Sequence, residues 1–171
     1  MNNLVVRALT GIVFVALLVG CTLWSPISFT VLFAVVTGLT VWEFSTNVNL
    51  HAGASVNRLI NTVAAIYLFL AFAGYCADYV PSRAFVPYII SIIYLLISEL
   101  YLQKPDPLKN WAYAFASQIY VALAFSMLCV LAFQYDPMTN KTHFEPLFPL
   151  SVFIFLWTSD TGAYLCGSML H

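Results

Sequence analysis

The chain alternates between long apolar runs and short polar segments. Six of the runs are about 17 to 23 residues long, close to the length that an α-helix needs to cross the hydrocarbon core of a membrane. No segment shows the alternating pattern of an outer-membrane barrel strand. The pattern therefore predicts an all-α fold, a polytopic transmembrane helical bundle of about six spans, at residues 8–24, 27–44, 59–77, 85–102, 111–133 and 147–168.

The segments between the runs carry residues that end helices. Ser25 and Pro26 predict a tight turn after the first run, and residues 45–57 are polar and contain Gly and Asn. Residues 78–83, 103–110 and 134–146 each contain proline, which cannot continue a helix interior. We therefore expect short loops at these places.

Composition supports a membrane protein and excludes other classes. Of the 171 residues, 62% are hydrophobic and 8% are charged, whereas a soluble globular domain carries about 25% charged residues. The mean hydropathy is +0.90. The net charge of −1 leaves no basic face for a nucleic acid. A soluble enzyme domain and a nucleic-acid partner are both excluded.

The basic residues of the loops predict the orientation of the chain, because cytoplasmic loops carry an excess of Lys and Arg. With six spans, four basic residues lie on the N-terminal side of the membrane and two on the other side. The four are Arg7, Arg58, Lys104 and Lys109, and the two are Arg83 and Lys141. This excess predicts a cytoplasmic N-terminus, so spans two, four and six run toward the cytoplasm.

Three acidic residues interrupt the apolar runs. Asp160 lies near the middle of the last run, whereas Glu43 and Glu99 lie close to the ends of the second and fourth runs. A carboxylate at the centre of a spanning helix costs about 2.5–3.5 kcal/mol on insertion scales, so such residues are candidates for a functional site. We expect all three on the cytoplasmic side, with Asp160 deepest.

A purely structural role, without a part in function, does not explain the three acids equally well. Glu43 and Glu99 can reach the interface or bond a neighbouring helix, and we favour this role for both. For Asp160 we favour function, because it belongs to a polar and aromatic stripe at i, i+3, i+4 and i+7 spacing. The other faces of that helix are Phe, Ile, Leu and Val. The stripe consists of Trp157, Asp160, Thr161, Tyr164, Gly167 and Ser168.

Motifs along the whole chain resemble one family. Residues 155–167, FLWTSDTGAYLCG, resemble the W-x-x-D-T-G-A-Y-x-x-G segment of bacterial phosphatidate cytidylyltransferases (CDP-diacylglycerol synthases). Residues 7–10 (RALT) are similar to the R-x-x-T start of that family, and residues 42–44 (WEF) to the W-E-F/Y that closes its second span. Residues 98–100 (SEL), 109–113 (KNWAY) and 119–121 (IYV) resemble its E-L…N-x-A-Y…I-Y-V region.

The resemblance implies a reaction between CTP and phosphatidate that gives CDP-diacylglycerol and pyrophosphate in phospholipid biosynthesis. It implies that Asp160 is catalytic and holds a cation or orients a metal-bound water, and that Thr161, Tyr164 and Gly167 line or shape the substrate pocket. Mg²⁺ is the expected cofactor, since a carboxylate without metal would repel polyanionic substrates. The resemblance implies a multi-pass protein of the bacterial inner membrane, in contact with membrane lipid. Whether it forms a homodimer stays open.

The resemblance ends before two further segments of the family. These are an S-P-x-K-[ST]-W-E-G segment and a signature with K-D and D-R-x-D elements, the second of which is associated with Mg²⁺ and the nucleotide phosphates. We therefore expect residues 1–171 to form the transmembrane N-terminal part of such an enzyme, without the C-terminal catalytic signature, and to be inactive alone.

Two other functions stay open on the residues alone. A fragment of an ion-coupled membrane transporter is one, because embedded carboxylates also mark ion pathways. Against it, the chain shows no repeat halves and no pair of Gly/Pro-broken spans. A non-catalytic membrane assembly subunit, in which the acids only bridge helices, is the other. An in-frame continuation that encodes the K-D and D-R-x-D elements would favour the enzyme.

Overall fold

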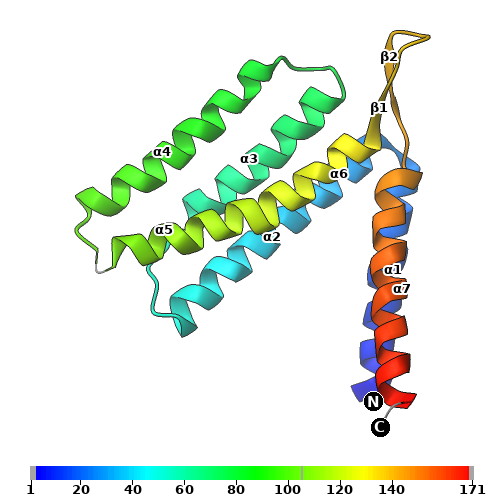
Figure 1. The fold of residues 1–171 in the computed structure, drawn as a ribbon, viewed down its shortest axis with the longest axis horizontal. Coiled ribbons are helices and arrows are strands. Elements are labelled where there is room, and N and C mark those ends of the chain that lie inside the picture. Colours follow the sequence, from blue (N-terminus) through cyan, green and yellow to red (C-terminus); the bar gives the residue numbers. More distant parts are fainter. Residues whose placement is uncertain (1–2, 105, 170–171) are drawn as a thin grey trace.

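A computed structural model describes residues 3–104 and 106–169 and shows an almost entirely helical chain (Figure 1). Helices cover all six predicted runs, so the all-α prediction is confirmed. The elements are α1 (Asn3–Trp24), α2 (Pro26–His51), α3 (Arg58–Cys76), the 3₁₀ turn η1 (Ser82–Phe85), α4 (Val86–Tyr101), α5 (Pro107–Ala116), the π-helical segment η2 (Ser117–Leu123), α6 (Ala124–Ala132), β1 (Phe133–Asp136), β2 (Lys141–Phe144) and α7 (Leu147–Met169).

Four helical segments in the described ranges are long and apolar enough to cross a membrane: Pro26–His51, Arg58–Cys76, Ser82–Tyr101 and Pro107–Ala132. Leu9–Trp24 is a shorter apolar stretch. The 23 residues of α7 are long enough, but its second half contains Asp160 and several hydroxyl residues that lower its hydropathy. The transmembrane bundle is thus confirmed, and the count of about six spans is approximate.

Local signals explain where the first helices begin. The Ser25 hydroxyl accepts a hydrogen bond from the Ser28 backbone N–H at 3.1 Å, and the Ser28 hydroxyl accepts one from the Ser25 N–H at 3.1 Å. This capping box, with Pro26 in the first turn, makes the predicted turn between α1 and α2. Asn57 caps α3 with a single bond, in which its side-chain oxygen accepts from the backbone N–H of Ile60 at 3.2 Å.

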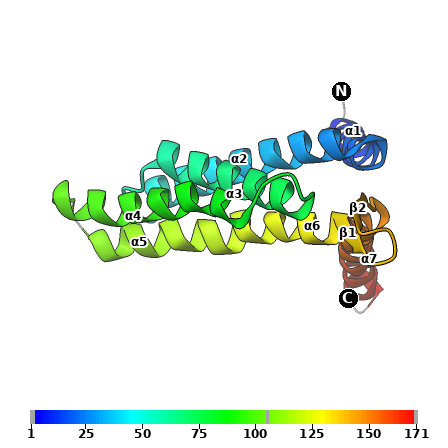
Figure 2. The ribbon, with the colours of Figure 1, turned by 90° about the horizontal axis from the view of Figure 1, so that it is seen from above.

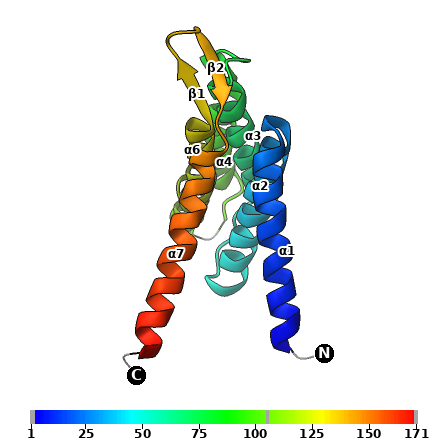
Figure 3. The same ribbon diagram turned by 90° about the vertical axis from the view of Figure 1, so that its right-hand side faces the viewer.

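Helices α2 to α6 pack together, and α1 and α7 stand at one end of this bundle. Figure 1 shows α1 and α7 running at an angle to the other helices, with both termini at the lower end of the view. Seen from above, the connection between α4 and α5 lies at one end of the molecule and α7 at the other (Figure 2). Helices α1 and α7 diverge toward the termini (Figure 3).

A phenylalanine-rich core joins α7 to the bundle. Phe29 and Phe33 of α2 and Phe69 of α3 are fully buried or nearly so, and the ring of Phe33 stacks on that of Phe153 with centroids 5.6 Å apart. Burying one such side chain contributes about 1.5–3 kcal/mol. Because Pro149 and Leu150 are the buried residues of α7, its first turns are fixed in the core and its second half is left uncovered.

Helix α2 is longer than the pattern predicts. It continues to His51, through the first half of the segment 45–57 that we expected to be a loop. The Asn49 side chain makes this extension stable, because it bonds the backbone N–H and carbonyl of Val56 at 2.8 and 2.9 Å. The chain then turns at Gly53, whose φ of 63° is a conformation that glycine adopts without strain.

A β-hairpin occupies the predicted loop 134–146. Strands β1 and β2 pair antiparallel, with Phe133 opposite Phe144. The turn is held by Asp136, whose carboxylate accepts hydrogen bonds from the Met138 backbone N–H at 2.9 Å and from the Thr139 hydroxyl at 2.7 Å. These local bonds give a structured turn in a segment that reads as irregular because it is polar and contains proline.

Candidate functional site

The second half of α7 presents the polar stripe that the sequence singles out. Asp160, Thr161, Tyr164 and Gly167 are all exposed, and the Thr161 hydroxyl donates to the carbonyl of Trp157 at 2.7 Å. Within residues 3–104 and 106–169, the Asp160 carboxylate has neither a hydrogen bond nor an ion pair. The structure therefore leaves this carboxylate available to a ligand.

Asp160 fits the binding of Mg²⁺ only as one ligand among several. The described part of the chain holds no group of three His, Cys, Asp or Glu side chains that could bind a metal ion. Mg²⁺, however, usually keeps several waters and binds through one or two carboxylates together with substrate phosphates. An exposed carboxylate without a protein partner suits that arrangement.

Glu43 lies on an exposed part of α2, about two turns before the helix ends. Its neighbour Trp42 lies under the guanidinium of Arg58, with Cζ 5.1 Å from the ring centroid. Arg58 Nη1 also donates to the Thr46 hydroxyl at 3.3 Å. In the described part of the chain Glu43 has no ion pair, and its role stays a prediction.

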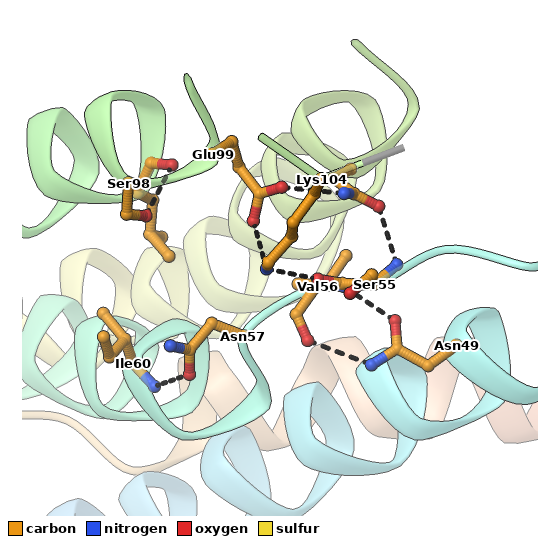
Figure 4. Close-up of polar contacts among 10 residues, drawn as sticks. Asn49, Ser55, Val56, Asn57, Ile60, Ser98, Glu99 and Lys104 are labelled. Carbon is orange, nitrogen blue, oxygen red and sulfur yellow. Dashed lines mark hydrogen bonds and ion pairs between the residues drawn. The ribbon is translucent and has the colours of Figure 1, made fainter. Parts of the chain in front are cut away.

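Glu99, in contrast, is buried and fully engaged at the end of α4 (Figure 4). Its Oε1 accepts a hydrogen bond from Lys104 Nζ at 2.7 Å, and its Oε2 accepts one from Asn110 Nδ2 at 2.7 Å. The side chain of Glu99 is 5% exposed and that of Lys104 is 20% exposed. A buried charge is tolerated when it is paired and hydrogen-bonded in this way. We call Ser55, Glu99, Lys104 and Asn110 the Glu99 cluster.

The Glu99 cluster ties two connections of the bundle together. Asn110 Oδ1 accepts from the Ser55 backbone N–H at 2.7 Å, and Lys104 Nζ donates to the Ser55 carbonyl at 2.7 Å. The connection between α2 and α3 therefore lies at the same end of the bundle as the one between α4 and α5. These contacts support the structural role that we favour for Glu99.

A second polar network lies inside the bundle, and sequence reasoning missed it. Asn61 Nδ2 donates to the hydroxyls of Ser45 at 3.0 Å and Ser117 at 2.7 Å, and Gln118 Nε2 donates to Asn61 Oδ1 at 2.8 Å. All four side chains are buried. They join α2 and α3 to η2, and π-helical turns occur frequently at functional sites. The sequence signal for this network is the presence of the polar residues Asn61, Ser117 and Gln118 inside apolar runs.

The structure does not gather the three acids into one site. Figures 1 and 2 place the end of α4, which carries Glu99, and α7, which carries Asp160, at opposite ends of the molecule. Helix α7 packs against α6 and α1. Asp160 and the Glu99 cluster are therefore separate features. The side chain of Arg7, which the orientation rule also uses, lies outside the described part.

A family model matches nearly the whole chain. The family is described as the cytidylyltransferase family, and the match covers residues 5–171. The chain belongs to this cytidylyltransferase family. Comparisons with curated proteins and with solved structures give no match. Membership of the cytidylyltransferase family implies nucleotidyl transfer with CTP as the nucleotide, carried out here by a membrane protein.

Proposed function

We propose that this protein is a phosphatidate cytidylyltransferase, which makes CDP-diacylglycerol and pyrophosphate from CTP and phosphatidate. The observation that carries the proposal is the exposed carboxylate of Asp160, which has no partner among the described residues and lies on a helix that begins in the apolar core. Asp160 lies about 15 Å along α7 from the buried Leu150, at a rise of about 1.5 Å per residue. A carboxylate at this depth is costly unless a polar group covers it, and a cation with a lipid phosphate would do so.

The reaction asks the protein for positioning more than for covalent chemistry. A phosphate oxygen of phosphatidate attacks the α-phosphorus of CTP, and the bond from this phosphorus to the oxygen that bridges to the β-phosphate breaks, so that pyrophosphate leaves. Mg²⁺, when bound, neutralises the charge of the phosphates. In this proposal Asp160 holds the ion through its carboxylate.

The neighbours of Asp160 suit a phosphate ligand. The proton of the Thr161 hydroxyl is used by the helix backbone, so its oxygen remains available as an acceptor. Tyr164, one turn further and 75% exposed, offers a phenolic donor. A Cβ placed on Gly167 would meet nothing within 4 Å, so a ligand can approach the backbone there. These residues would bind and orient the substrates.

The orientation of the helices agrees with access to both substrates. In Figure 1, α2, α4 and α7 all run toward the lower part of the view. If the basic loop residues mark the cytoplasmic side, the second half of α7 lies in the cytoplasmic leaflet of the bacterial inner membrane. There a lipid phosphate at the bilayer surface can meet cytosolic CTP.

The test is an assay of the protein expressed from its complete reading frame, with phosphatidate, labelled CTP and Mg²⁺. We expect Asp160→Asn to reduce CDP-diacylglycerol formation at least about 100-fold, as loss of one electrostatic stabiliser commonly does, with normal insertion into the membrane. Asp136→Asn, in the hairpin, is the matched control and should keep activity. Near-normal turnover of Asp160→Asn at saturating Mg²⁺ contradicts the assigned role. Absence of turnover in the unaltered protein contradicts the proposed substrate, whereas the family match favours transfer over ion transport or assembly.

A further inference from the structure

An apolar groove lies between α2, the η2–α6 segment and α7. It has a volume of about 580 Å³. Thr40 is one of its few polar residues, and the Thr40 hydroxyl already donates to the Val36 carbonyl at 2.8 Å. Its other walls are mostly aliphatic and aromatic, including Ala124 and Leu128 of α6 and Val152 and Leu156 of α7. The groove therefore favours an apolar occupant.

The last groove residue on α7, Leu156, lies one helical turn before Asp160 of the polar stripe. Val152, Leu156 and Asp160 are spaced four residues apart, so they follow one another along one face of the helix. Asp160 lies about 6 Å beyond Leu156, at about 1.5 Å per residue. One continuous surface of α7 thus changes from apolar to polar over a single turn. Such a surface matches an amphiphile with an acyl chain at one end and a charged group at the other.

The order of the apolar and polar parts along α7 matches the order of acyl chain and phosphate in a lipid of the cytoplasmic leaflet. Helix α7 runs from the hairpin toward the end that we assign to the cytoplasm. Its groove residues therefore lie farther from the cytoplasmic surface than Asp160 does. A phospholipid of that leaflet points its acyl chains to the centre and its phosphate outward. The order of groove and stripe is the same.

A second groove lacks this continuity. It has a volume of about 290 Å³ and is lined by Pro26, Gly74, Tyr79 and Phe133 among others. These residues lie where α2 begins, α3 ends and the hairpin starts, at the opposite end of the helices from the Glu99 cluster. Asp160 does not adjoin it, so an acyl chain there would not bring its phosphate to the stripe.

The size of the larger groove also argues against a helix as its occupant. A helix about 10 Å wide fills roughly 420 Å³ for each turn of about 5.4 Å. The groove therefore has room for little more than one turn, which is too short a contact to seat a spanning helix. An acyl chain is one methylene wide and can use the same volume along its length.

We propose that this groove binds an acyl chain of the lipid substrate while the lipid phosphate lies at Asp160. This assignment rests on the proposed function, because it takes the substrate to be a phospholipid with a terminal phosphate. It makes α7 and α6 together the element that recognises the apolar part of the substrate.

The experiment uses a phosphatidate with a diazirine in the middle of one acyl chain, in phosphatidylcholine nanodiscs that contain the protein from its complete reading frame. Irradiation without CTP separates binding from turnover. We expect adducts within residues 119–128 or 152–156. Ala124→Trp places a large side chain in the groove and should reduce labelling about tenfold, because losing the burial of about two methylene groups is enough for this change. Ala116→Trp, at an exposed position outside the lining, is the matched control and should label normally.

Turnover adds a second readout. Ala124→Trp should lower kcat/KM about tenfold for dioleoyl phosphatidate and leave it within about twofold for dihexanoyl phosphatidate, whose short chains have little to bury. Adducts outside the groove in the unaltered protein overturn the inference, and this test does not depend on whether Ala124→Trp folds. Such adducts are the result expected if a second copy of the chain or another segment fills the groove. Absence of turnover with either lipid instead overturns the proposed function, and the adducts still decide where the acyl chain binds.

Discussion

Removing Lys104 should destabilise the protein more than removing the charge of Glu99. In Lys104→Met the Glu99 carboxylate stays buried and keeps only the Asn110 amide as a partner. Breaking a buried ion pair from one side costs about 3–5 kcal/mol. The Lys104 side chain is 20% exposed, so water reaches part of the site and we expect the lower end, about 3 kcal/mol.

Glu99→Gln is the milder change because the amide oxygen of the glutamine can take the place of Glu99 Oε2 and accept from Asn110. Lys104 then keeps its bond to the Ser55 carbonyl at 2.7 Å and its partial contact with water. The loss is that of one charged hydrogen bond, about 1.5 kcal/mol. The double variant removes both charges and leaves no buried ion, so we expect it to cost about 2 kcal/mol less than the sum of the single variants.

The assay is reversible unfolding in mixed detergent–SDS micelles at neutral pH, with the free energy of unfolding compared across the cycle. Lys141→Met and Glu145→Gln form the matched control cycle, since both residues are exposed and no ion pair joins them in the described part of the chain. That cycle should be additive. Equal costs for Lys104→Met and Glu99→Gln, with additive effects, would refute a buried, coupled pair.

Two further predictions concern the ends of the bundle. In a cysteine-free background, His51→Cys and Gln103→Cys should each react with an impermeant maleimide from the cytoplasmic side, because the bond between Ser55 and Asn110 holds their two connections at the same end of the bundle. Met138→Cys should react from the other side, because Met138 is in the hairpin. Labelling of His51→Cys or Gln103→Cys from outside intact cells would overturn this orientation. The pKa of Asp136 is held below its ordinary value of 3.8, first by the Thr139 hydroxyl and then by the Met138 amide. A lowered folded pKa means that the hairpin is stabilised above pH 3.8 and loses this stabilisation as pH falls through the folded value. The amide shift of Met138 should therefore titrate with a midpoint below 3.8 and stay flat in Asp136→Asn, and a midpoint at or above 3.8 would contradict the assignment.

The helices could be predicted because their signal is local. Four of the helical segments are long and apolar enough to span a membrane, and Ser25 and Pro26 mark the turn between the first two runs. The end of α2 could not be predicted in this way. Residues 45–51 are polar and read as a loop, and only the contact of Asn49 with Val56 shows why the helix continues.

The burial of the acids could not be predicted, because it depends on contacts between distant residues. The sequence predicts that Asp160 lies deepest in the membrane, because it is mid-run, and that Glu99 either reaches the interface or bonds a neighbouring helix. The structure shows bonding for Glu99, and the depth of Asp160 stays a prediction. Glu99 is enclosed by Lys104, Asn110 and the loop that contains Ser55, whereas Asp160 lies on the uncovered half of α7.

Glu99 and Asp160 differ in what the described part of the fold provides to offset their charge. A carboxylate at the centre of a spanning helix costs about 2.5–3.5 kcal/mol, and Asp160 lies near the middle of the last apolar run, whereas Glu99 lies near the end of α4. For Glu99 an ammonium and an amide fixed within the fold offset the cost of its burial, so the charge is compensated without a ligand. For Asp160 nothing in the described part of the chain offsets it. In the proposed function, this compensation comes from a cation that also binds a lipid phosphate. Binding of the substrates would then relieve a cost that folding leaves in place, and this makes α7 the part of the bundle where activity should be sought.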